Sequence, residues 1–138
     1  MIIIYTDGSS RGNPGPGGWG CHIITGKKTH EIYGRSKMTT NNEMELLAAV
    51  KALEFFPESE KIILRTDSTY VLKGITEWIV GWKKKGWKNS KKETVKNLNL
   101  WKRLDSLNQK HSVKWEKVKG HSGDPGNDRA DYLATFEN

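Results

Sequence analysis

The chain has 138 residues, of which 35% are hydrophobic and 28% are charged, and its formal net charge is +7. This composition excludes a disordered chain, and the length suits one domain covering residues 1–138. The basic charge favours nucleic acid as a partner, although it could serve solubility alone. No apolar segment is long enough to span a membrane, and no signal-peptide pattern is present. The single cysteine, Cys21, is expected to be a packed core residue and fits a reducing compartment. The sequence therefore predicts a cytoplasmic protein.

The N-terminal segment predicts a buried strand that ends in a carboxylate. Four β-favouring residues, 2–5, lead into Asp7 and Gly8. We therefore expect Asp7 to lie where a core strand ends and Gly8 to begin a turn. Because loops at strand ends commonly hold ligands in sheet proteins, Asp7 is a candidate site residue.

The next segment predicts an antiparallel meander. Residues 12–18 are rich in glycine and proline and indicate a tight connection, in which Asn13 could donate to a ligand. Residues 19–25 and 31–37 are expected to be strands, with a hairpin turn at 26–28 between them.

A capping box indicates where the first helix begins. Thr40 is expected to cap free amides and Glu43 to reach back, and the helix should run from residue 41 to about 55, where Pro57 stops it. Glu45 in its second turn shares a face with small apolar residues. A carboxylate on such a face is costly unless it is paired, so a ligand-binding Glu45 is favoured over one at the boundary with solvent.

Residues 61–66 predict a further strand, which ends at Asp67 in the same way that the first strand ends at Asp7. Taken alone, Asp67 would be better explained as the cap of a helix over 68–77. The matching pattern of the two strands favours a shared site instead.

A basic segment, here called the basic ledge (residues 78–92), follows. Trp78 and Trp82 lie four apart, and residues 83–92 contain six lysines and no acidic residue. A run of charge is usually only a solvated surface, but lysines interleaved with tryptophans favour contact with phosphates. The tryptophans themselves are expected to pack rather than to stack on bases.

The C-terminal part predicts a helix over 95–107, a strand over 112–118, a loop carrying His121, and a final helix from Pro125. Asp131 lies in that helix, where favourable interaction with the helix dipole explains it as well as a functional role does. The order β-β-β-α-β-α-α-α-β-α predicts an α/β (α+β) protein with a mixed sheet covered by helices.

The candidates Asp7, Glu45, Asp67 and Asp131, with the loop residue His121, suggest a metal-dependent hydrolase. Carboxylates without a cysteine cluster favour Mg²⁺ or Mn²⁺ over zinc. Two such ions, about 3.5–4 Å apart, would offset the mutual repulsion of the carboxylates and are a known arrangement for phosphodiester hydrolysis. Spacing along the chain leaves the convergence of these residues open.

Eight motifs in a fixed order carry a resemblance to a known family: residues 5–9, 12–18, 39–42, 44–46, 66–68, 82–88, 118–121 and 127–131. Over nearly its full length the chain resembles bacterial type 1 ribonuclease H. The resemblance implies a five-stranded mixed sheet, with three antiparallel strands and then parallel strands, flanked by helices. It also implies a monomeric endonuclease that cleaves the RNA strand of RNA–DNA hybrids and leaves 5′-phosphate and 3′-hydroxyl ends.

The resemblance further implies a role for each candidate. Asp7 would bridge two Mg²⁺ ions, with Mn²⁺ as a substitute, and Asp131 would complete the site of the ion that activates water. Glu45 and Asp67 would hold the ion at the leaving oxygen, and Glu45 would also accept a hydrogen bond from a ribose 2′-hydroxyl, which distinguishes RNA from DNA. His121 would shuttle protons or assist product release.

Substrate contacts are implied in the same way. The positions that match contacts in the hybrid minor groove are Asn13, Asn41, Asn42 and Asn127. A pocket for a phosphate of the DNA strand matches Thr40 and Asn97, and the ledge residues implied to grip that strand are Trp78, Lys83, Lys84, Lys85 and Lys88. None of these contacts reads base edges, so little sequence specificity is expected.

Two positions depart from the family pattern. Glu43 stands where a basic residue is familiar, and Thr69 stands where a glutamine is expected, which puts one substrate contact at each position in doubt. Two other functions stay open: a binding module that lacks catalysis, and a nuclease of the same fold that acts on another substrate, as integrases and junction resolvases do.

Overall fold

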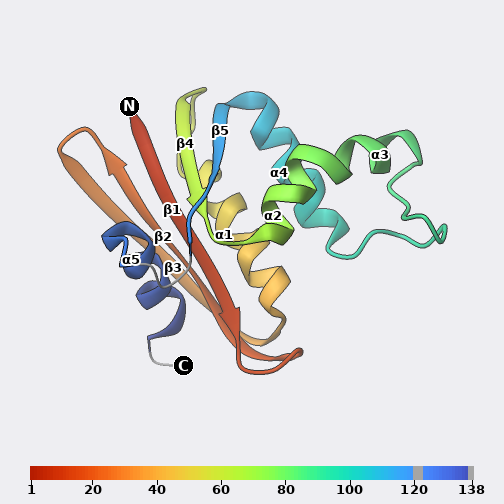
Figure 1. Ribbon diagram of the computed structural model, residues 1–138, viewed down its shortest axis with the longest axis horizontal. Coiled ribbons are helices and arrows are strands. Elements are labelled where there is room, and N and C mark those ends of the chain that lie inside the picture. The colour runs from red at the N-terminus through yellow and green to blue at the C-terminus, as the bar shows by residue number, and fades with distance from the viewer. Residues whose placement is uncertain (120–122, 137–138) are drawn as a thin grey trace.

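A computed structural model describes residues 1–119 and 123–136. Figure 1 shows a sheet with helices packed against it. The elements, in chain order, are β1 (Ile2–Ser10), β2 (Gly15–Thr25), β3 (Lys28–Thr39), α1 (Asn41–Glu54), β4 (Lys61–Thr66), α2 (Thr69–Lys73), the π-helical turn η1 (Gly74–Trp78), α3 (Ile79–Lys84), α4 (Leu98–Lys110), β5 (Ser112–Lys117) and α5 (Pro125–Thr135). Among the described residues, no helix has the length and apolar character needed to cross a membrane.

The sheet has the strand order β3-β2-β1-β4-β5. Strands β1, β2 and β3 form the expected antiparallel meander, whereas β4 pairs parallel to β1 and β5 pairs parallel to β4. The predicted five-stranded mixed sheet is therefore confirmed. The parallel register pairs Thr6 of β1 with Thr66 of β4, and this is the last pair of that ladder.

The two faces of the sheet are covered by different helices. Alternation along β1 places Gly8 against α1, whereas Tyr5 contacts Gly126 of α5. Cys21 of β2 lies on the α1 face, where its thiol donates to the carbonyl of Ala48 (3.2 Å), so the expectation that it is a packed core residue is confirmed. Helix α3 and the chain leading from it to α4 extend away from the sheet on one side (Figure 1).

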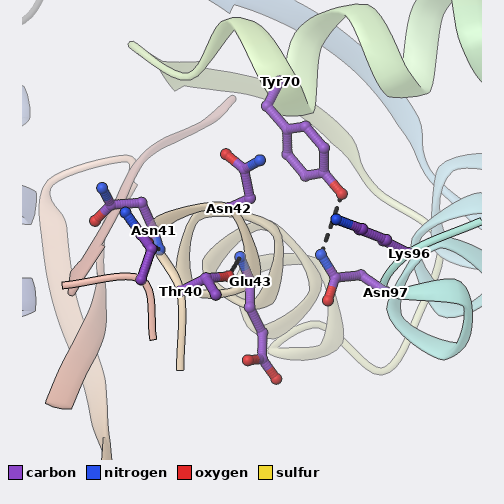
Figure 2. Close-up of a pocket in the computed structure, with 8 residues that line it drawn as sticks. Thr40, Asn41, Asn42, Glu43, Tyr70, Lys96 and Asn97 are labelled. Carbon is purple, nitrogen blue, oxygen red and sulfur yellow. Dashed lines mark hydrogen bonds between the residues drawn. The ribbon is translucent and has the colours of Figure 1, made fainter. Parts of the chain in front are cut away.

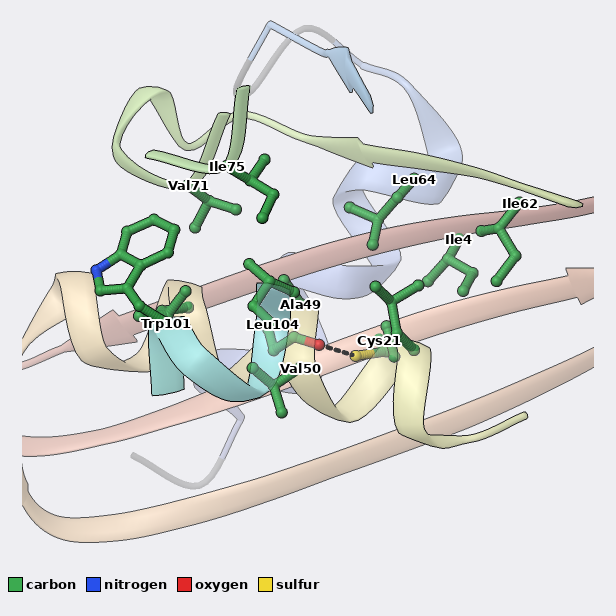
Figure 3. Packing of buried hydrophobic residues seen from close by; sticks show 14 of the residues in the cluster. Ile4, Cys21, Ala49, Val50, Ile62, Leu64, Val71, Ile75, Trp101 and Leu104 are labelled. Carbon is green, nitrogen blue, oxygen red and sulfur yellow. Dashed lines mark hydrogen bonds between the residues drawn. The ribbon is translucent and has the colours of Figure 1, made fainter. Parts of the chain in front are cut away.

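The main core lies between α1, α4 and the sheet. Ile4, Leu64, Trp101 and Leu104 have no exposed surface there, and Figure 3 shows them packed around α1 residues. Burial of each such side chain contributes roughly 1.5–3 kcal/mol. The indole of Trp101 is also hydrogen-bonded, because its Nε1 donates to the Tyr70 hydroxyl (3.0 Å).

Several predicted boundaries were wrong. Strand β1 continues to Ser10, so Asp7 lies inside the strand and Gly8 begins no turn. The second half of the glycine-rich segment belongs to β2, which starts at Gly15, and β3 is longer at both ends than expected. Helix α4 starts at Leu98 rather than at residue 95, because Asn97 before it has a left-handed conformation (φ 58°).

The alternative role for Asp67, as a helix cap, was also wrong. Ser68 is the N-cap of α2, and its hydroxyl accepts from the backbone N–H of Val71 (3.1 Å). The side chain of Asp67 is therefore not needed to begin this helix.

Candidate active site

The register of the parallel ladder brings two carboxylates together. Asp7 and Asp67 each directly follow the final pair of that ladder, Thr6 with Thr66, so they are neighbours at the same end of the two strands. Asp7 is only 9% exposed. Its Oδ1 accepts from the N–H of Gly8 (2.9 Å).

Two glycines allow the helices on both faces to approach Asp7. A Cβ on Gly8 would overlap the backbone of Met44 and Glu45, so this glycine sets how closely α1 lies to β1. Gly20 pairs with Asp7 across the antiparallel ladder, and a Cβ there would lie 2.5 Å from the Cβ of Leu133 in α5. The two close approaches bring the helix that carries Glu45 and the helix that carries Asp131 toward the same residue.

Helix α5 is further held by an ion pair to the edge strand. Arg129 of α5 donates from Nη2 to Oε1 of Glu31 in β3 (2.8 Å). The same interaction lowers the pKa of Glu31 below its usual range. Because Arg129 lies two residues before Asp131, this contact helps to fix the helix at the level of the site.

The electrostatics of the cluster reflect burial and mutual repulsion. Burial, the charge of Asp67 and a hydrogen bond to Asp131 raise the pKa of Asp7 to about 8. Burial and the charge of Asp67 raise the pKa of Glu45 to about 7, although a hydrogen bond from Ser68 opposes the shift. Asp7, Glu45, Asp67 and Asp131 therefore form one interacting group.

The donor set suits a hard divalent cation. Among the residues that the structure describes, none of the four carboxylates forms an ion pair with a basic side chain. Within the same residues, no group of three or more acidic, histidine or cysteine side chains is arranged so that it could hold a metal ion by itself. Mg²⁺ usually completes its octahedral shell with water and substrate phosphate oxygens, so protein carboxylates need to supply only part of that shell.

A cleft of about 630 Å³, lined by polar side chains, lies at the start of α1 (Figure 2). Five predicted substrate-binding residues line it, namely Asn13, Thr40, Asn41, Asn42 and Asn97. The N–H of Asn41 donates to Oδ1 of Asn13 (2.9 Å), which ties the loop after β1 to the start of α1. Asn97 donates from Nδ2 to the hydroxyl of Tyr70 (3.1 Å).

Three more residues line the cleft: Glu43, Tyr70 and Lys96. The sequence reasoning missed Tyr70 and Lys96 as site residues, although Tyr70 lies three residues after Asp67 and Lys96 directly precedes Asn97. Thr40 caps α1 as predicted, since its hydroxyl accepts from the N–H of Glu43 (3.1 Å). The second half of the expected capping box differs from the prediction, because the Glu43 carboxylate accepts a hydrogen bond from the Thr39 hydroxyl (2.7 Å).

The basic ledge forms a second hollow. Trp78, Lys85 and Lys88 contribute to its lining. Trp78 is 39% exposed, and its ring lies 6.0 Å from that of Trp82, so it packs on one side and is open on the other. Lys83 and Lys84 are both exposed, and Lys83 forms an ion pair with Asp105 (2.9 Å).

Comparison with known proteins identifies the family. The sequence pattern of the RNase H family matches residues 1–137. The chain belongs to the ribonuclease H family. It is 56% identical to Ribonuclease H of Alcanivorax borkumensis over 133 residues, which cover 96% of this chain and 88% of that protein. It is also 56% identical to Ribonuclease HI of Caulobacter vibrioides, covering 96% and 89%.

A solved structure shares the fold of this ribonuclease H chain. The crystal structure of LC9-RNase H1, described as a type 1 RNase H with the type 2 active-site motif, is similar with a TM-score of 0.86 and 28% identity. The similarity covers 96% of this chain and 69% of the other.

Two further predicted site residues of this ribonuclease H chain are His121 and Asn127. His121 lies outside the described residues. Asn127 is only 3% exposed, so little of its side chain can be reached from outside.

Proposed function

We propose that residues 1–138 form a single catalytic domain that hydrolyses the RNA strand of RNA–DNA hybrids and leaves 5′-phosphate and 3′-hydroxyl ends. The observation that carries this proposal is the group of four carboxylates, Asp7, Glu45, Asp67 and Asp131, in a chain of the ribonuclease H family. Desolvation of Asp7 and Glu45, together with repulsion from Asp67, makes this group costly to maintain for stability alone.

Two Mg²⁺ ions, for which Mn²⁺ can substitute, suit this group. We assign Asp7 as the shared ligand, Asp131 as a further ligand of one ion, and Glu45 and Asp67 as ligands of the other. When bound, such ions lower the pKa of a coordinated water and stabilise charge on the phosphate. Glu45 has a second proposed task, which is to accept a hydrogen bond from the ribose 2′-hydroxyl beside the scissile phosphate. DNA has no such hydroxyl, so this contact would favour the RNA strand.

The cleft and the basic ledge are proposed to hold the hybrid. Asn13, Asn41 and Asn42 would lie in its minor groove, while Thr40 and Asn97 would bind a phosphate of the DNA strand. The ledge would grip the same strand through Trp78 and its lysines. Because these contacts address the backbone and the groove, cleavage should depend little on sequence.

Three assignments remain predictions. We propose His121 as the group that moves protons or assists product release. The buried Asn127 fits a role in orienting its neighbours better than direct contact with the hybrid. A monomer acting in the cytoplasm is the expected state of the protein.

The decisive experiment compares the chain with its Asp7→Asn variant on labelled RNA–DNA hybrid, duplex DNA and duplex RNA, with Mg²⁺, Mn²⁺ or chelator. We expect cleavage of the hybrid RNA alone, dependent on the divalent ion, and no cleavage by Asp7→Asn. The control is Asp128→Asn, which removes an exposed carboxylate from α5 and should leave cleavage unchanged. Retention of the hybrid without cleavage by the wild type would indicate a binding module, and preferential cutting of duplex DNA would indicate another nuclease class.

A further inference from the structure

Lys117 at the end of β5 reaches across to the turn that presents Asp67. Its Nζ donates to the main-chain carbonyl of Asp67 (2.9 Å) and to the hydroxyl of Thr69 (2.5 Å). The strands hold the lysine at this level, because Lys117 pairs with Thr66 and the N–H of Val118 donates to the Thr66 carbonyl (3.0 Å). One ammonium group therefore joins the end of β5 to the connection between β4 and α2.

The contact from Lys117 adds to the hydrogen bonds within the turn. Inside the turn, Ser68 donates from its N–H to the Thr66 hydroxyl (3.1 Å) and caps α2 with its own hydroxyl. These contacts order the residues on either side of Asp67, whereas its carbonyl is bound by Lys117. Hydrogen bonds from a charged donor are stronger than neutral ones, so Lys117 is well suited to hold the peptide that aims the Asp67 carboxylate.

The charge of Lys117 also acts on the carboxylate group. Among the causes of the pKa shift of Glu45, the Lys117 charge opposes the rise that burial and Asp67 produce. Lys117 is itself exposed, but its ammonium group is held beside the carboxylates by two neutral oxygen acceptors, the carbonyl of Asp67 and the hydroxyl of Thr69.

We propose that Lys117 is a positioning residue for hybrid cleavage, which fixes the turn that holds the Asp67 carboxylate beside Asp7 and Glu45. Thr69 provides the second anchor for the ammonium group, at the position where the family pattern has a glutamine. This proposal rests on the proposed function. A direct contact between Lys117 and a substrate phosphate is the competing explanation, and it predicts different kinetics.

Kinetics of Lys117→Met, Lys117→Arg and Thr69→Val test the proposal. For Lys117→Met we expect kcat to fall about tenfold, while KM for the hybrid stays within about twofold and the salt dependence of binding is unchanged. Lys117→Arg, which keeps a charged donor, should recover most of the loss, and Thr69→Val should lower kcat by about threefold. Lys114→Met is the matched control, because it removes a lysine from the same strand whose side chain is 72% exposed and faces Glu116 instead.

A second measurement is independent of turnover. Mg²⁺ is titrated in the absence of hybrid while the amide resonance of Asp67 is followed by NMR. A loosened Asp67 should weaken Mg²⁺ binding several-fold in Lys117→Met, whereas loss of a positive charge alone should strengthen it. The sign of the change therefore separates positioning from simple electrostatics.

Three outcomes would overturn the proposal: a raised KM with unchanged kcat and a flatter salt dependence, tighter Mg²⁺ binding in Lys117→Met, or no difference from Lys114→Met. Failure of the wild type to cleave any hybrid would contradict the proposed function instead. In that case the Mg²⁺ titration still decides whether Lys117 positions Asp67.

Discussion

Asp7 is buried in the sheet, and the charges that act on it come from the carboxylates of Asp67 and Asp131. Its pKa of about 8 means that at neutral pH the metal-free protein holds a proton on it that the unfolded chain would release. Such a side chain opposes folding at neutral pH and is retained, in our proposal, because bound cations reverse the penalty.

The first prediction concerns the stability of Asp7→Asn. Between pH 4 and 8 the folded chain binds one more proton at Asp7 than the unfolded chain, so the contribution of Asp7 to stability falls as pH rises through this window. Asp7→Asn removes the effect at nearly constant volume. With chelator present, we expect its melting temperature at pH 8 to exceed that of the wild type by at least about 3 °C, which corresponds to roughly 1 kcal/mol.

Thermal unfolding at pH 4, 6 and 8 measures this difference. The advantage of Asp7→Asn should be smallest at pH 4, where Asp7 is protonated in the folded chain and partly protonated in the unfolded one. Addition of Mg²⁺ should stabilise the wild type more than the variant. A difference that is independent of pH would show that Asp7 is not the group that carries the proton.

At the scale of elements, the close approach of α1 to β1 at Gly8 sets the position of the helix, and the sequence pattern did not predict this contact. A side chain on Gly8 would overlap main-chain atoms of α1, which cannot move aside as a flexible side chain can. For Gly8→Ala we therefore expect a loss of stability of at least about 2 kcal/mol, in the range of overpacked cores, together with a fall in kcat as Glu45 is displaced.

Gly81→Ala is the matched control for Gly8→Ala. Gly81 lies within α3 and has no atom within 4 Å of its Cβ position, so alanine should stabilise the protein by up to about 1 kcal/mol through helix propensity. Urea unfolding of both variants provides the comparison. Equal stability of Gly8→Ala and wild type would contradict the proposed role of Gly8 in setting the helix position.

The distinction between local patterns and contacts between separate elements explains which elements could be predicted from the sequence. Local patterns indicated the five strands, the capping of α1 by Thr40 and the start of α5, because each depends on residues close in sequence. The extension of β1 through Asp7 and Gly8, and of β2 into the glycine-rich segment, depends on partner strands and on helices that approach these glycines. The late start of α4 goes with the left-handed Asn97 and with a hydrogen bond outside helical spacing, from the N–H of Val95 to the carbonyl of Trp87 (3.1 Å).

At the scale of the whole molecule, the candidate site was predictable by resemblance rather than by spacing. Asn13, Asn41 and Asn97 come from three separate parts of the chain and line one cleft. No local pattern connects them, because the meander and the packing of α4 bring them together. Lys117 was missed for the same reason: its partners lie across a parallel strand pair, about fifty positions away in the sequence.

The distribution of positive charge leads to the last prediction. The formal charge of +7 is unevenly placed, and Lys84, Lys85 and Lys88 are exposed on the basic ledge, which extends away from the sheet (Figure 1). Replacing these three by glutamine should raise KM for the hybrid and flatten its dependence on salt, with a decrease in log–log slope of about one for each phosphate that a lysine no longer neutralises. Lys83 is left unchanged because it is paired with Asp105.

The control for this variant removes the same charge elsewhere. Lys27, Lys28 and Lys61 are exposed at the end of the sheet opposite Asp7, since residues 25 and 62 both pair with Ile2. If binding responds only to net charge, both triple variants should weaken it equally at low salt, because long-range attraction does not depend on where the lysines stand. If the basic ledge contacts phosphates, only the ledge variant should show a weaker dependence of KM on salt concentration. Its kcat at saturating hybrid should stay close to that of the wild type, because the carboxylate group is unchanged. Equal slopes for the two variants would make the ledge an ordinary solvated surface.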